Sequence, residues 1–423
     1  MSRLFQTNMT HFRTLMVIGG SYDQLPMIHR ARELGCRTLA VDGNPSAPGM
    51  EHADEALVID TSDLDAVTTA ARQHQISGIC TMATNLGPRT VSHVAAQLGL
   101  PAVSCAAAEN ATDKNAMKAA CRAAGVPVAA GETCSSAEEA VSVAQIHGYP
   151  LLLKAADASG CRGIEPAFSE EEIHQRFDLA QRESRNALVV VERYYPDARV
   201  IGAESLISRG HTHLIFSAEK MVRRHPRIST AGVTVPTDLS KTETEELRDQ
   251  LSALHKALGL DIGASHVDLV QAEGKWLVID VGPRLGGGPM IHHLAPSLTG
   301  VNMVDFIVRQ ALGEEPEINS KIISGVGVER FFYSPVEGHL TSIQLPAIPA
   351  DARMQWRKPV GSHMAPDGPN VDRIGYLSLI ASDLATAEQQ VAQIASQIHL
   401  GVRLTDQTIQ SVAPRILSSE ITL

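Results

Sequence analysis

The sequence lacks paired cysteines, long apolar runs and an excess of basic residues, and each absence excludes a class of protein. Its six cysteines form no CxxC pair. In a chain of 423 residues we therefore expect buried thiols rather than a disulfide framework. The formal net charge of −11 argues against an extended nucleic-acid surface, which requires the opposite sign.

No uninterrupted apolar run approaches the roughly 20 residues that a membrane-spanning helix needs. The first residues, MSRLFQTNMTHFR, contain no apolar stretch ahead of a cleavage site. We therefore expect a cytoplasmic protein without a membrane or nucleic-acid partner.

Two common nucleotide-binding motifs are also missing. The Walker A pattern GxxxxGK[ST] does not occur. Gly19-Gly20 followed by Asp42 suggests a dinucleotide site, but GxGxxG would require glycines where Ser21 and Gln24 stand. A tight strand-to-helix turn is the favoured interpretation, and a nicotinamide-dependent dehydrogenase is disfavoured.

The length suits two to four domains, and residues 14–110 alternate between strands and helices. Short apolar strands are expected at 15–18, 37–41, 56–59 and 78–82, with helices at 25–34 and from Asp63. This alternation is typical of a parallel, doubly wound sheet.

The stretch richest in chemistry runs from Ser265 to Gly288 and reads as two strands joined by a polar turn. Asp268 and Asp280 fall on different strands, and an antiparallel hairpin can place them side by side. Adjacent carboxylates repel unless a cation lies between them, and Mg²⁺ binds through such oxygens together with substrate phosphates. Arg284 and the triple glycine 286–288 follow, which suit an anionic group and close backbone approach. A surface hairpin with scattered charges is the alternative.

A helix is expected from the capping residue Asp113 to Ala124. Lys114 and Lys118 lie one helical turn apart on one face of it. From spacing alone, a solvated pair is the favoured interpretation.

Lys154 ends an apolar strand and is followed by a small-residue loop that contains Ser159, Gly160 and Gly163. A lysine beside a glycine-rich loop can hold a phosphate, because the side chain supplies charge and the loop supplies backbone N–H groups. Turn glycines without a ligand are the equal alternative.

The strand 188–192 ends at Glu192 and leads into a short linker that contains Tyr195. Such a linker can offer backbone groups to a purine edge, and Glu192 can accept from an exocyclic amine. A core strand with an exposed terminal acid explains the same residues.

The segment 220–236, KMVRRHPRISTAGVTVP, is basic and has no interleaved aromatic residues. We expect a loop here, either a mobile lid that meets an anionic ligand or a solvated surface loop.

From residue 324 onward the strands at 325–333, 339–344 and 374–381 and the helix at 386–398 indicate a small α+β domain.

Taken in chain order, Lys114 and Lys118, Lys154 with its glycine loop, Glu192, and IDVGPRLGGG at 279–288 resemble the ATP-grasp superfamily, in particular its carboxylate–amine ligases. The resemblance covers about residues 16–312. It implies α/β and α+β multidomain architecture. The expected parts are a Rossmann-like domain at 1–110, an ATP-grasp lid at 111–195, a central catalytic domain at 196–318 and an α+β domain at 319–423.

The resemblance also implies roles for individual residues. Nucleotide contacts would come from Lys114, Lys118, Lys154, Ser159, Gly160, Gly163, Glu192, Tyr195 and Lys220. Asp268 and Asp280 would hold Mg²⁺ or Mn²⁺, and Arg284 would stabilise the negative charge of an acyl phosphate and tetrahedral intermediate. Candidate substrate contacts are His266, Gly287, Gly288 and His292; for the histidines a structural hydrogen-bonded role is the alternative.

Three positions depart from the family pattern. Asp280 stands where glutamate is usual, and Gly282 stands where asparagine is usual, so one oxygen ligand for a second metal ion is missing. Arg199 stands where an acid usually binds the ribose, and Asp197 or Glu204 could substitute.

The leading hypothesis is an ATP-dependent ligase that joins an amino-acid carboxylate to an amine through an acyl phosphate, as a homodimer acting on small molecules. Three alternatives stay open. They are an enzyme that activates bicarbonate or formate, an ATP-binding protein without catalysis and, last, a dehydrogenase. No biotin-carrier Met-Lys-Met stretch is present, although a separate carrier subunit would leave no trace in this chain.

Overall fold

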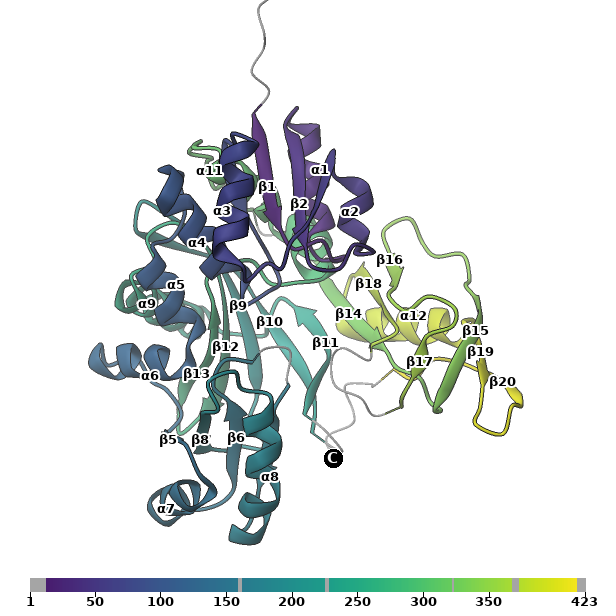
Figure 1. The fold of residues 1–423 in the computed structure, drawn as a ribbon. Helices are drawn as coiled ribbons and strands as arrows, with labels where there is room; N and C mark the ends of the chain where they lie inside the picture. Colours follow the sequence, from purple (N-terminus) through teal and green to yellow (C-terminus); the bar gives the residue numbers. More distant parts are fainter. Residues whose placement is uncertain (1–12, 159–161, 225–227, 322, 367–372, 417–423) are drawn as a thin grey trace, which may run out of the picture.

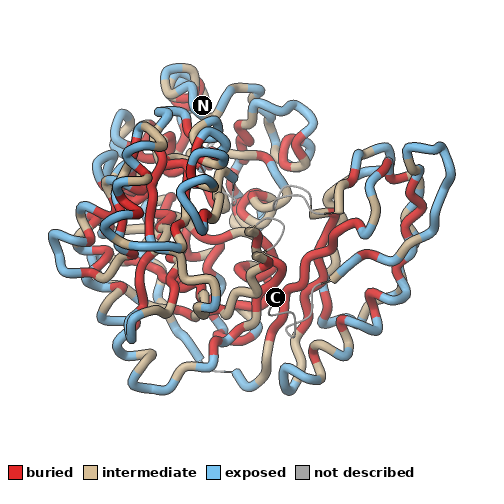
Figure 2. The backbone as a smooth tube through the Cα atoms, turned by 90° about the horizontal axis from the view of Figure 1, so that it is seen from below, coloured by how far each residue is buried: buried red, intermediate tan, exposed pale blue. Residues whose placement is uncertain are grey.

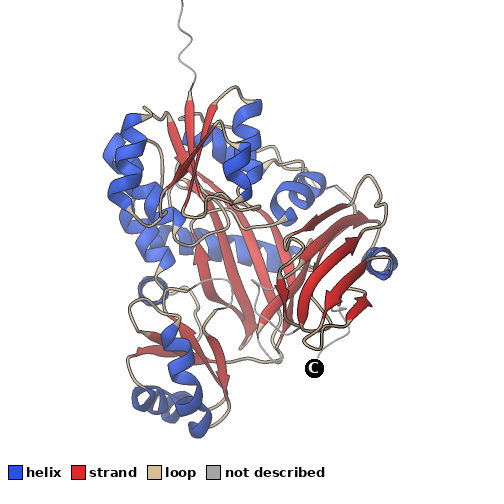
Figure 3. Cartoon of the chain, turned by 45° about the vertical axis from the view of Figure 1, so that its right-hand side comes forward, coloured by secondary structure: helices blue, strands red, loops and turns tan. Residues whose placement is uncertain are grey.

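The chain is described here from a computed structural model that covers residues 13–158, 162–224, 228–321, 323–366 and 373–416. These residues form a parallel sheet near the N-terminus, a long antiparallel sheet through the middle, and two smaller sheets at the periphery (Figures 1 and 3). Buried segments follow the strands, whereas the outer helices are exposed on one side (Figure 2).

The N-terminal sheet is parallel and has the strand order β3-β2-β1-β4. Its strands are β1 (Thr14–Ile18), β2 (Arg37–Asp42), β3 (Glu55–Val58) and β4 (Gly78–Cys80). Its helices are α1 (Leu25–Glu33), α2 (Pro48–His52), α3 (Leu64–Gln73) and α4 (Gly87–Leu98). Alternate residues of β1 enter different hydrophobic clusters, one containing α1 and the other α3 and α4. Helices therefore cover both faces, and the predicted doubly wound sheet is confirmed.

The central sheet has eight antiparallel strands in the order β13-β12-β9-β10-β11-β14-β18-β16. The strands before residue 319 are β9 (Val200–Ser208), β10 (His211–Arg223), β11 (Ser229–Val235), β12 (Gly263–Ala272) and β13 (Lys275–Gly282). Three helices cover one face of this part of the sheet: α5 (Cys105–Thr112), α6 (Lys114–Ala123) and α9 (Lys241–Leu258).

Helix α9 decides which face of the central sheet is closed. Ser240 and Glu243 form a capping box at its start, and Gly259 ends it in the left-handed conformation. Its buried leucines, spaced by three and four residues, share a cluster with Val267 and Leu269 of β12. Because side chains alternate along a strand, Asp268 points to the opposite, open face.

A separate four-stranded sheet, in the order β5-β8-β6-β7, lies at the bottom of Figure 1. Its strands are β5 (Gly131–Cys134), β6 (Leu151–Ala155), β7 (Ile164–Ala167) and β8 (Val189–Arg193), and its helices are α7 (Ala137–His147) and α8 (Glu170–Arg182). It has its own hydrophobic core. An isolated β-bridge between Val128, which lies just before β5, and Val278 of β13 connects this sheet to the central sheet.

The C-terminal segment extends the central sheet with β14 (Val326–Phe332), β16 (Arg353–Trp356) and β18 (Gly375–Ala381). It also forms a sheet in the order β17-β15-β19-β20, from β15 (Gly338–Gln344), β17 (His363–Met364), β19 (His399–Arg403) and β20 (Ile409–Val412). Helix α12 (Leu384–Ser396) packs against β14 and β18, and its buried residues share a hydrophobic cluster with residues of both sheets. The strands and helix predicted here are confirmed, but the expected boundary at 319 does not interrupt the central sheet.

The prediction of a loop over 220–236 was wrong. Residues up to Arg223 continue β10, and β11 pairs with them from Ser229. The sequence signal misled because Arg223 is buried, with its Nε donating to the Ser229 hydroxyl at 3.0 Å and its guanidinium stacked 4.9 Å from the Tyr333 ring. Cation–π contact and hydrogen bonding satisfy a charge that composition alone assigns to solvent. His225 lies outside the described residues.

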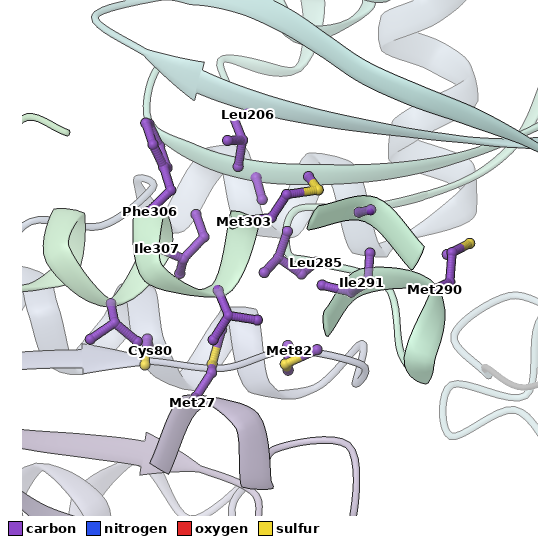
Figure 4. Close-up of a cluster of buried hydrophobic side chains, with 14 of the residues drawn as sticks. Met27, Cys80, Met82, Leu206, Leu285, Met290, Ile291, Met303, Phe306 and Ile307 are labelled. Carbon is purple, nitrogen blue, oxygen red and sulfur yellow. The ribbon is translucent and has the colours of Figure 1, made fainter. Parts of the chain in front are cut away.

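A hydrophobic cluster joins the N-terminal sheet to the central sheet (Figure 4). It includes Cys80 and Met82 near β4, Leu206 of β9, and Leu285 and Met290 on either side of the triple glycine. A short π-helix, η1 (Met290–Leu294), and the helices α10 (Ala295–Thr299) and α11 (Met303–Ala311) complete it. Buried anchors thus hold both ends of the glycine loop.

Among the described helices, none combines the length and apolarity that crossing a bilayer requires.

Candidate active site

A cavity of about 520 Å³ lies between the N-terminal sheet, the β5–β8 sheet, the central sheet and the C-terminal segment. Its polar lining includes Asp23, Asn85, Lys114, Lys154, Arg162, Glu192, Tyr195, Lys220, His266, Asp268, Asp280, Arg284, Gly286–Gly288, Glu329, Arg357 and Arg373. Residues from four separate parts of the chain therefore meet at one site.

Asp268 and Asp280 are directly opposite each other in the β12–β13 register, as the hairpin pattern predicts. Opposed residues of neighbouring strands share a face, and both line the cavity. The side chain of Asp280 is 30% exposed and lies 3.4 Å from the Lys114 Nζ. Asp280 is thus the more accessible of the two carboxylates.

Asp268 belongs to a largely shielded chain of charged groups, of which only Glu204 is fully buried. It contacts the Lys220 ammonium, and its Oδ1 lies 3.0 Å from the His266 Nε2. The His266 Nδ1 in turn lies 2.5 Å from the Glu204 Oε1. Burial opposes its charge, but Lys220 and His266 outweigh burial and hold the pKa of Asp268 well below its usual range. Burial likewise opposes protonation of His266, yet Glu204 and Asp268 raise its pKa.

Glu204, which was considered as a ribose-binding acid, does not reach the cavity. It is fully buried beneath His266, where it also accepts from the Gly286 backbone N–H at 3.3 Å. Neither Glu204 nor Asp197 lines the cavity. Arg199 is paired with Glu219 at 2.7 Å, so its charge is already matched.

Lys118 and Lys154 converge on Glu192 rather than on solvent. Lys154 Nζ lies 2.5 Å from one carboxylate oxygen and Lys118 contacts the other, with side chains of all three at most 5% exposed. The favoured solvated pair of lysines was therefore wrong for both. Lys114 is buried beside Asp280, and Lys118 faces inward and also donates to the Ala129 carbonyl at 2.9 Å. Lys118 does not line the cavity, whereas Lys154 and Glu192 do.

Glu192 is expected to be critical for stability. Burial disfavours its charge, but Lys118 and Lys154 lower its pKa. Glu192→Gln leaves two buried ammonium groups without their partner and should reduce the free energy of unfolding by about 3 kcal/mol, measured by urea denaturation at pH 7. Because the pKa is lowered, this stabilisation is present above the ordinary value of 4.5 and is lost as the pH falls below it.

The exposed Glu246 on α9 provides the matched control. Glu246→Gln should leave stability within about 0.5 kcal/mol of the native chain. Equal effects of the two substitutions, or a Glu192→Gln effect that does not shrink in acid, would contradict the ion-pair explanation.

Lys114 and Lys154 lie beside Asp280 and its neighbour Ile279 on β13. Lys114 Nζ donates to the Ala158 carbonyl at 2.9 Å, and Lys154 Nζ donates to the Ile279 carbonyl at 3.3 Å. With Lys220, they place three ammonium groups around the carboxylate pair. This concentration of positive charge suits a polyphosphate.

The glycine loop after Lys154 is described only in part. Ser159 and Gly160 lie outside the described residues. Gly163 has φ +61°, and a Cβ there would lie 2.8 Å from the Glu183 Cβ and 2.9 Å from the Ala155 Cβ. Gly163 is therefore needed for packing and does not line the cavity.

Tyr195 lines the cavity in the linker between β8 and β9, as expected. Its hydroxyl donates to the Glu273 Oε1 at 2.9 Å. This bond ties the linker to the β12–β13 turn, so the β5–β8 sheet and the aspartate hairpin are fastened at this point.

Arg284 explains the glycine at position 282. A Cβ on Gly282 would lie 2.6 Å from the Arg284 Cζ and 2.8 Å from its Nη2. The guanidinium thus occupies the place where a side chain at 282 would start. Its Nη2 donates to the Asn85 Oδ1 at 2.9 Å, and its buried Nε has no hydrogen-bond partner among the described residues.

The triple glycine loop is shaped by two buried acids. A Cβ on Gly286 would lie 2.4 Å from the Glu204 Oε1, and one on Gly288, whose φ is +75°, would lie 2.7 Å from the Glu329 Oε1. The Gly288 backbone N–H donates to the Asp23 Oδ1 at 3.0 Å. Side chains at these positions would collide with carboxylates, so the glycines allow the loop to lie against them.

His292 does not line the cavity, contrary to the expectation of a substrate contact. Burial lowers its pKa to about 4, which favours the neutral ring. The neighbouring His293 is bonded to the Ser378 hydroxyl at 2.9 Å. The structural role considered for these histidines is the better description of His293, which is buried in η1, whereas His292 is half-buried there.

Comparison with known families gives one extended match. The family model described as carbamoyl-phosphate synthase L chain, ATP binding domain, matches residues 113–318. These are the residues that carry α6, the β5–β8 sheet and the aspartate hairpin. Residues 113–318 therefore form an ATP-binding domain of the ATP-grasp type.

Solved structures show the same fold over nearly the whole chain. L-amino acid ligase from Bacillus licheniformis is 16% identical with a TM-score of 0.77 and covers 93% of this chain and 99% of its own. Phosphoribosylglycinamide synthetase from Anaerococcus prevotii is 21% identical, with a TM-score of 0.76 and coverages of 92% and 99%. The biotin carboxylase domain of Hydrogenobacter thermophilus 2-oxoglutarate carboxylase, solved with MgADP and bicarbonate, is 19% identical, with a TM-score of 0.76 and coverages of 96% and 92%.

The ATP-grasp site has a donor set that fits magnesium only together with a nucleotide. Among the described residues no group of three or more His, Cys, Asp or Glu side chains could hold a metal ion alone. Mg²⁺ binds through one or two carboxylates and takes phosphates and water for the rest. The accessible Asp280, opposite Asp268 and beside three lysines, meets that requirement.

Five polar lining residues of this ATP-grasp site were missed by sequence reasoning: Asp23, Asn85, Glu329, Arg357 and Arg373. They lie on segments outside the motif-bearing region, between 45 and 261 positions away from Arg284 along the chain, and no local pattern marks four of them. Only Asp23 had a signal, because it lies just after Gly19-Gly20 at the carboxyl end of a parallel strand, where open α/β sheets place their sites.

Proposed function

We propose that this chain is an ATP-dependent carboxylate–amine ligase that joins amino-acid-like substrates through an acyl phosphate. The observation that supports it is the opposition of Asp268 and Asp280 on one face of the β12–β13 hairpin, within one cavity that also contains three lysines and Arg284. Phosphoryl transfer depends mainly on positioning and charge neutralisation, and this arrangement supplies both.

Lys114, Lys154 and Lys220 are proposed to bind the phosphates of ATP. Asp280, with Asp268, would hold Mg²⁺, which when bound neutralises phosphate charge and orients the transferred group. The linker at Tyr195 would hold the base. Lys118 acts indirectly in this scheme, because its ion pair with Glu192 holds that carboxylate and Lys154 in place.

Arg284 is proposed to stabilise the negative charge that develops on the acyl phosphate and on the tetrahedral intermediate. Its buried Nε, which has no partner among the described residues, is a donor available for a substrate oxygen. A donor fixed in advance by Asn85 loses little freedom when that charge appears.

Two expectations attached to this function stay predictions. One is the division at residues 110, 195 and 318 into Rossmann-like, lid, central and C-terminal parts. The other is a homodimer, which light scattering of the purified chain would test.

The activity is tested by ADP release from Mg-ATP with the twenty protein amino acids as a pool, and by hydroxamate formation when hydroxylamine is added. An amino-acid ligase should release ADP only when amino acids are present, and hydroxylamine should capture its acyl phosphate. ADP release that ignores amino acids, together with absence of hydroxamate, would rule the proposal out.

A second candidate, activation of bicarbonate, is favoured by the likeness to a carboxylase domain solved with bicarbonate. The same assay separates it, because ADP release would then follow bicarbonate. Release with formate would indicate the formate-activating alternative. ATP binding without turnover in every pool would indicate a binding protein, for which the missing ligand at Gly282 is the motivating feature.

A further inference from the structure

One end of the cavity has no role in the nucleotide chemistry. It is formed by Glu329 and Phe331 of β14, Arg357 after β16, Arg373 before β18, and Asp23 of the N-terminal part. Asp23 and Glu329 lie against Gly288 of the triple glycine loop, which begins two residues after Arg284. Whatever binds there lies next to the centre where an acyl phosphate would form.

Two buried polar atoms at this end have no hydrogen-bond partner within the described part of the chain. They are the Oε1 of Glu329, an acceptor, and the Nε of Arg357, a donor. Glu329 is 2% exposed. Native proteins rarely leave such groups unpaired, because the loss of hydration is not recovered. One acceptor and one donor together match a ligand that carries both an ammonium and a carboxylate.

Asp23 fixes this end of the cavity to the glycine loop. Its Oδ1 accepts from the Arg357 Nη2 at 2.8 Å and from the Gly288 backbone N–H at 3.0 Å. The Glu329 carboxylate lies against the bare Cα of Gly288, where a Cβ would be 2.7 Å away. The unpaired acceptor and donor are therefore held in place relative to the loop that carries Arg284.

We propose that this end of the cavity binds the amine substrate as a zwitterionic α-amino acid, with Glu329 receiving the ammonium and its proton and Arg357 binding the carboxylate. The inference rests on the proposed ligase function, which supplies the acyl phosphate. Glu329 is then a catalytic residue, and Asp23 is a positioning residue that holds Arg357.

The step balances without a further reactant. The ammonium gives one proton to Glu329, and the neutral nitrogen attacks the acyl carbon. A C–N bond forms as the C–O bond to phosphate breaks, and the second nitrogen proton leaves on phosphate as HPO₄²⁻. Glu329 returns its proton to solvent after the products leave.

The surroundings of Glu329 favour such proton transfer near neutral pH. Burial raises its pKa to about 7, although Arg373 and Arg357 act in the opposite direction, and Asp23 raises it further. Tyr376 also faces this group, and the Met290 backbone is hydrogen-bonded to it. A base is most effective when its pKa lies near the working pH, so amide formation should rise as the pH increases through about 7.

Glu329→Gln separates this inference from the ligase function. Hydroxylamine is largely neutral at neutral pH and needs no base, so hydroxamate formation with the amino-acid pool should stay within about twofold of the native enzyme. Amide formation from the same pool should fall on the order of 100-fold and lose its rise with pH. The exposed Glu337→Gln should change neither.

The possible outcomes are distinguishable. Amide formation within about threefold of native, or equal losses of amide and hydroxamate, would overturn the role of Glu329 while leaving the ligase intact. If the native enzyme forms neither product, the ligase function fails and this inference fails with it.

Arg357 is tested by amines with and without a carboxylate. The native enzyme should prefer amino acids to their amides as acceptors, and Arg357→Gln should reduce that preference at least about tenfold by raising KM for amino acids alone. Arg353→Gln, on the neighbouring β16, should retain the preference. Unchanged discrimination in the Arg357 variant would overturn the assignment of the carboxylate position.

Discussion

Arg284→Ala is expected to lower the rate of amide formation by on the order of 100- to 1,000-fold while MgATP binding stays nearly unchanged. The guanidinium is fixed by Asn85 at 2.9 Å and lies over Gly282, where no side chain competes for the space. Its charge therefore meets an oxyanion without rearrangement. Alanine removes a contact that strengthens only as negative charge develops, so kcat should fall and the affinity for the nucleotide should not.

Steady-state ADP release and isothermal titration with a non-hydrolysable ATP analogue measure these two effects separately. Arg248→Ala, on the exposed side of α9, removes the same charge far from the cavity and should behave as the native enzyme. Near-normal turnover in Arg284→Ala would exclude the residue from the mechanism. Loss of nucleotide binding instead would make it an ATP contact.

Asp280→Asn is expected to reduce turnover by on the order of 1,000-fold and to raise the Mg²⁺ concentration for half-maximal activity at least about tenfold. The two aspartates are not equivalent. Asp268 is already engaged by Lys220 and His266, whereas Asp280 is 30% exposed and has Lys114 at 3.4 Å. The accessible carboxylate is the one from which a hard cation gains most.

Turnover measured over a range of Mg²⁺ concentrations at fixed ATP gives both quantities. Asparagine preserves the size of the side chain, so thermal unfolding should show little change. Asp249→Asn on α9 is the matched control for loss of one exposed carboxylate. An unchanged Mg²⁺ dependence in Asp280→Asn would place the metal elsewhere.

The hairpin that carries these residues could be predicted because it is local. A polar turn between two β-rich runs sets the register, and register determines that positions 268 and 280 are opposed. The doubly wound N-terminal sheet was predictable for the same reason, since its strands are apolar on both faces. Lys154 at a strand end also needed only the local pattern.

The contacts of Lys118 and Glu204 could not be predicted, because each depends on a partner far along the chain. Lys118 pairs with Glu192, 74 positions later, and Glu204 lies under His266, 62 positions later. The sequence alone does not indicate whether a charged side chain will be buried or exposed to solvent. The arginines of 220–236 misled in the same way, since Arg223 is satisfied by Ser229 and the Tyr333 ring.

The sequence by itself determined the apolar alternation, the helix caps and the hairpin, because each depends on neighbours within a few turns or one strand pair. It also determined the order of lysines and aspartates that resembles ATP-grasp enzymes, because that order is read directly along the chain. The tertiary structure alone decided that Asp23, Glu329 and Arg357 meet at the glycine loop. Their approach results from β14 continuing the central sheet and from the core that holds Leu285 and Met290. Such meetings arise from packing between distant segments, for which no short-range pattern exists.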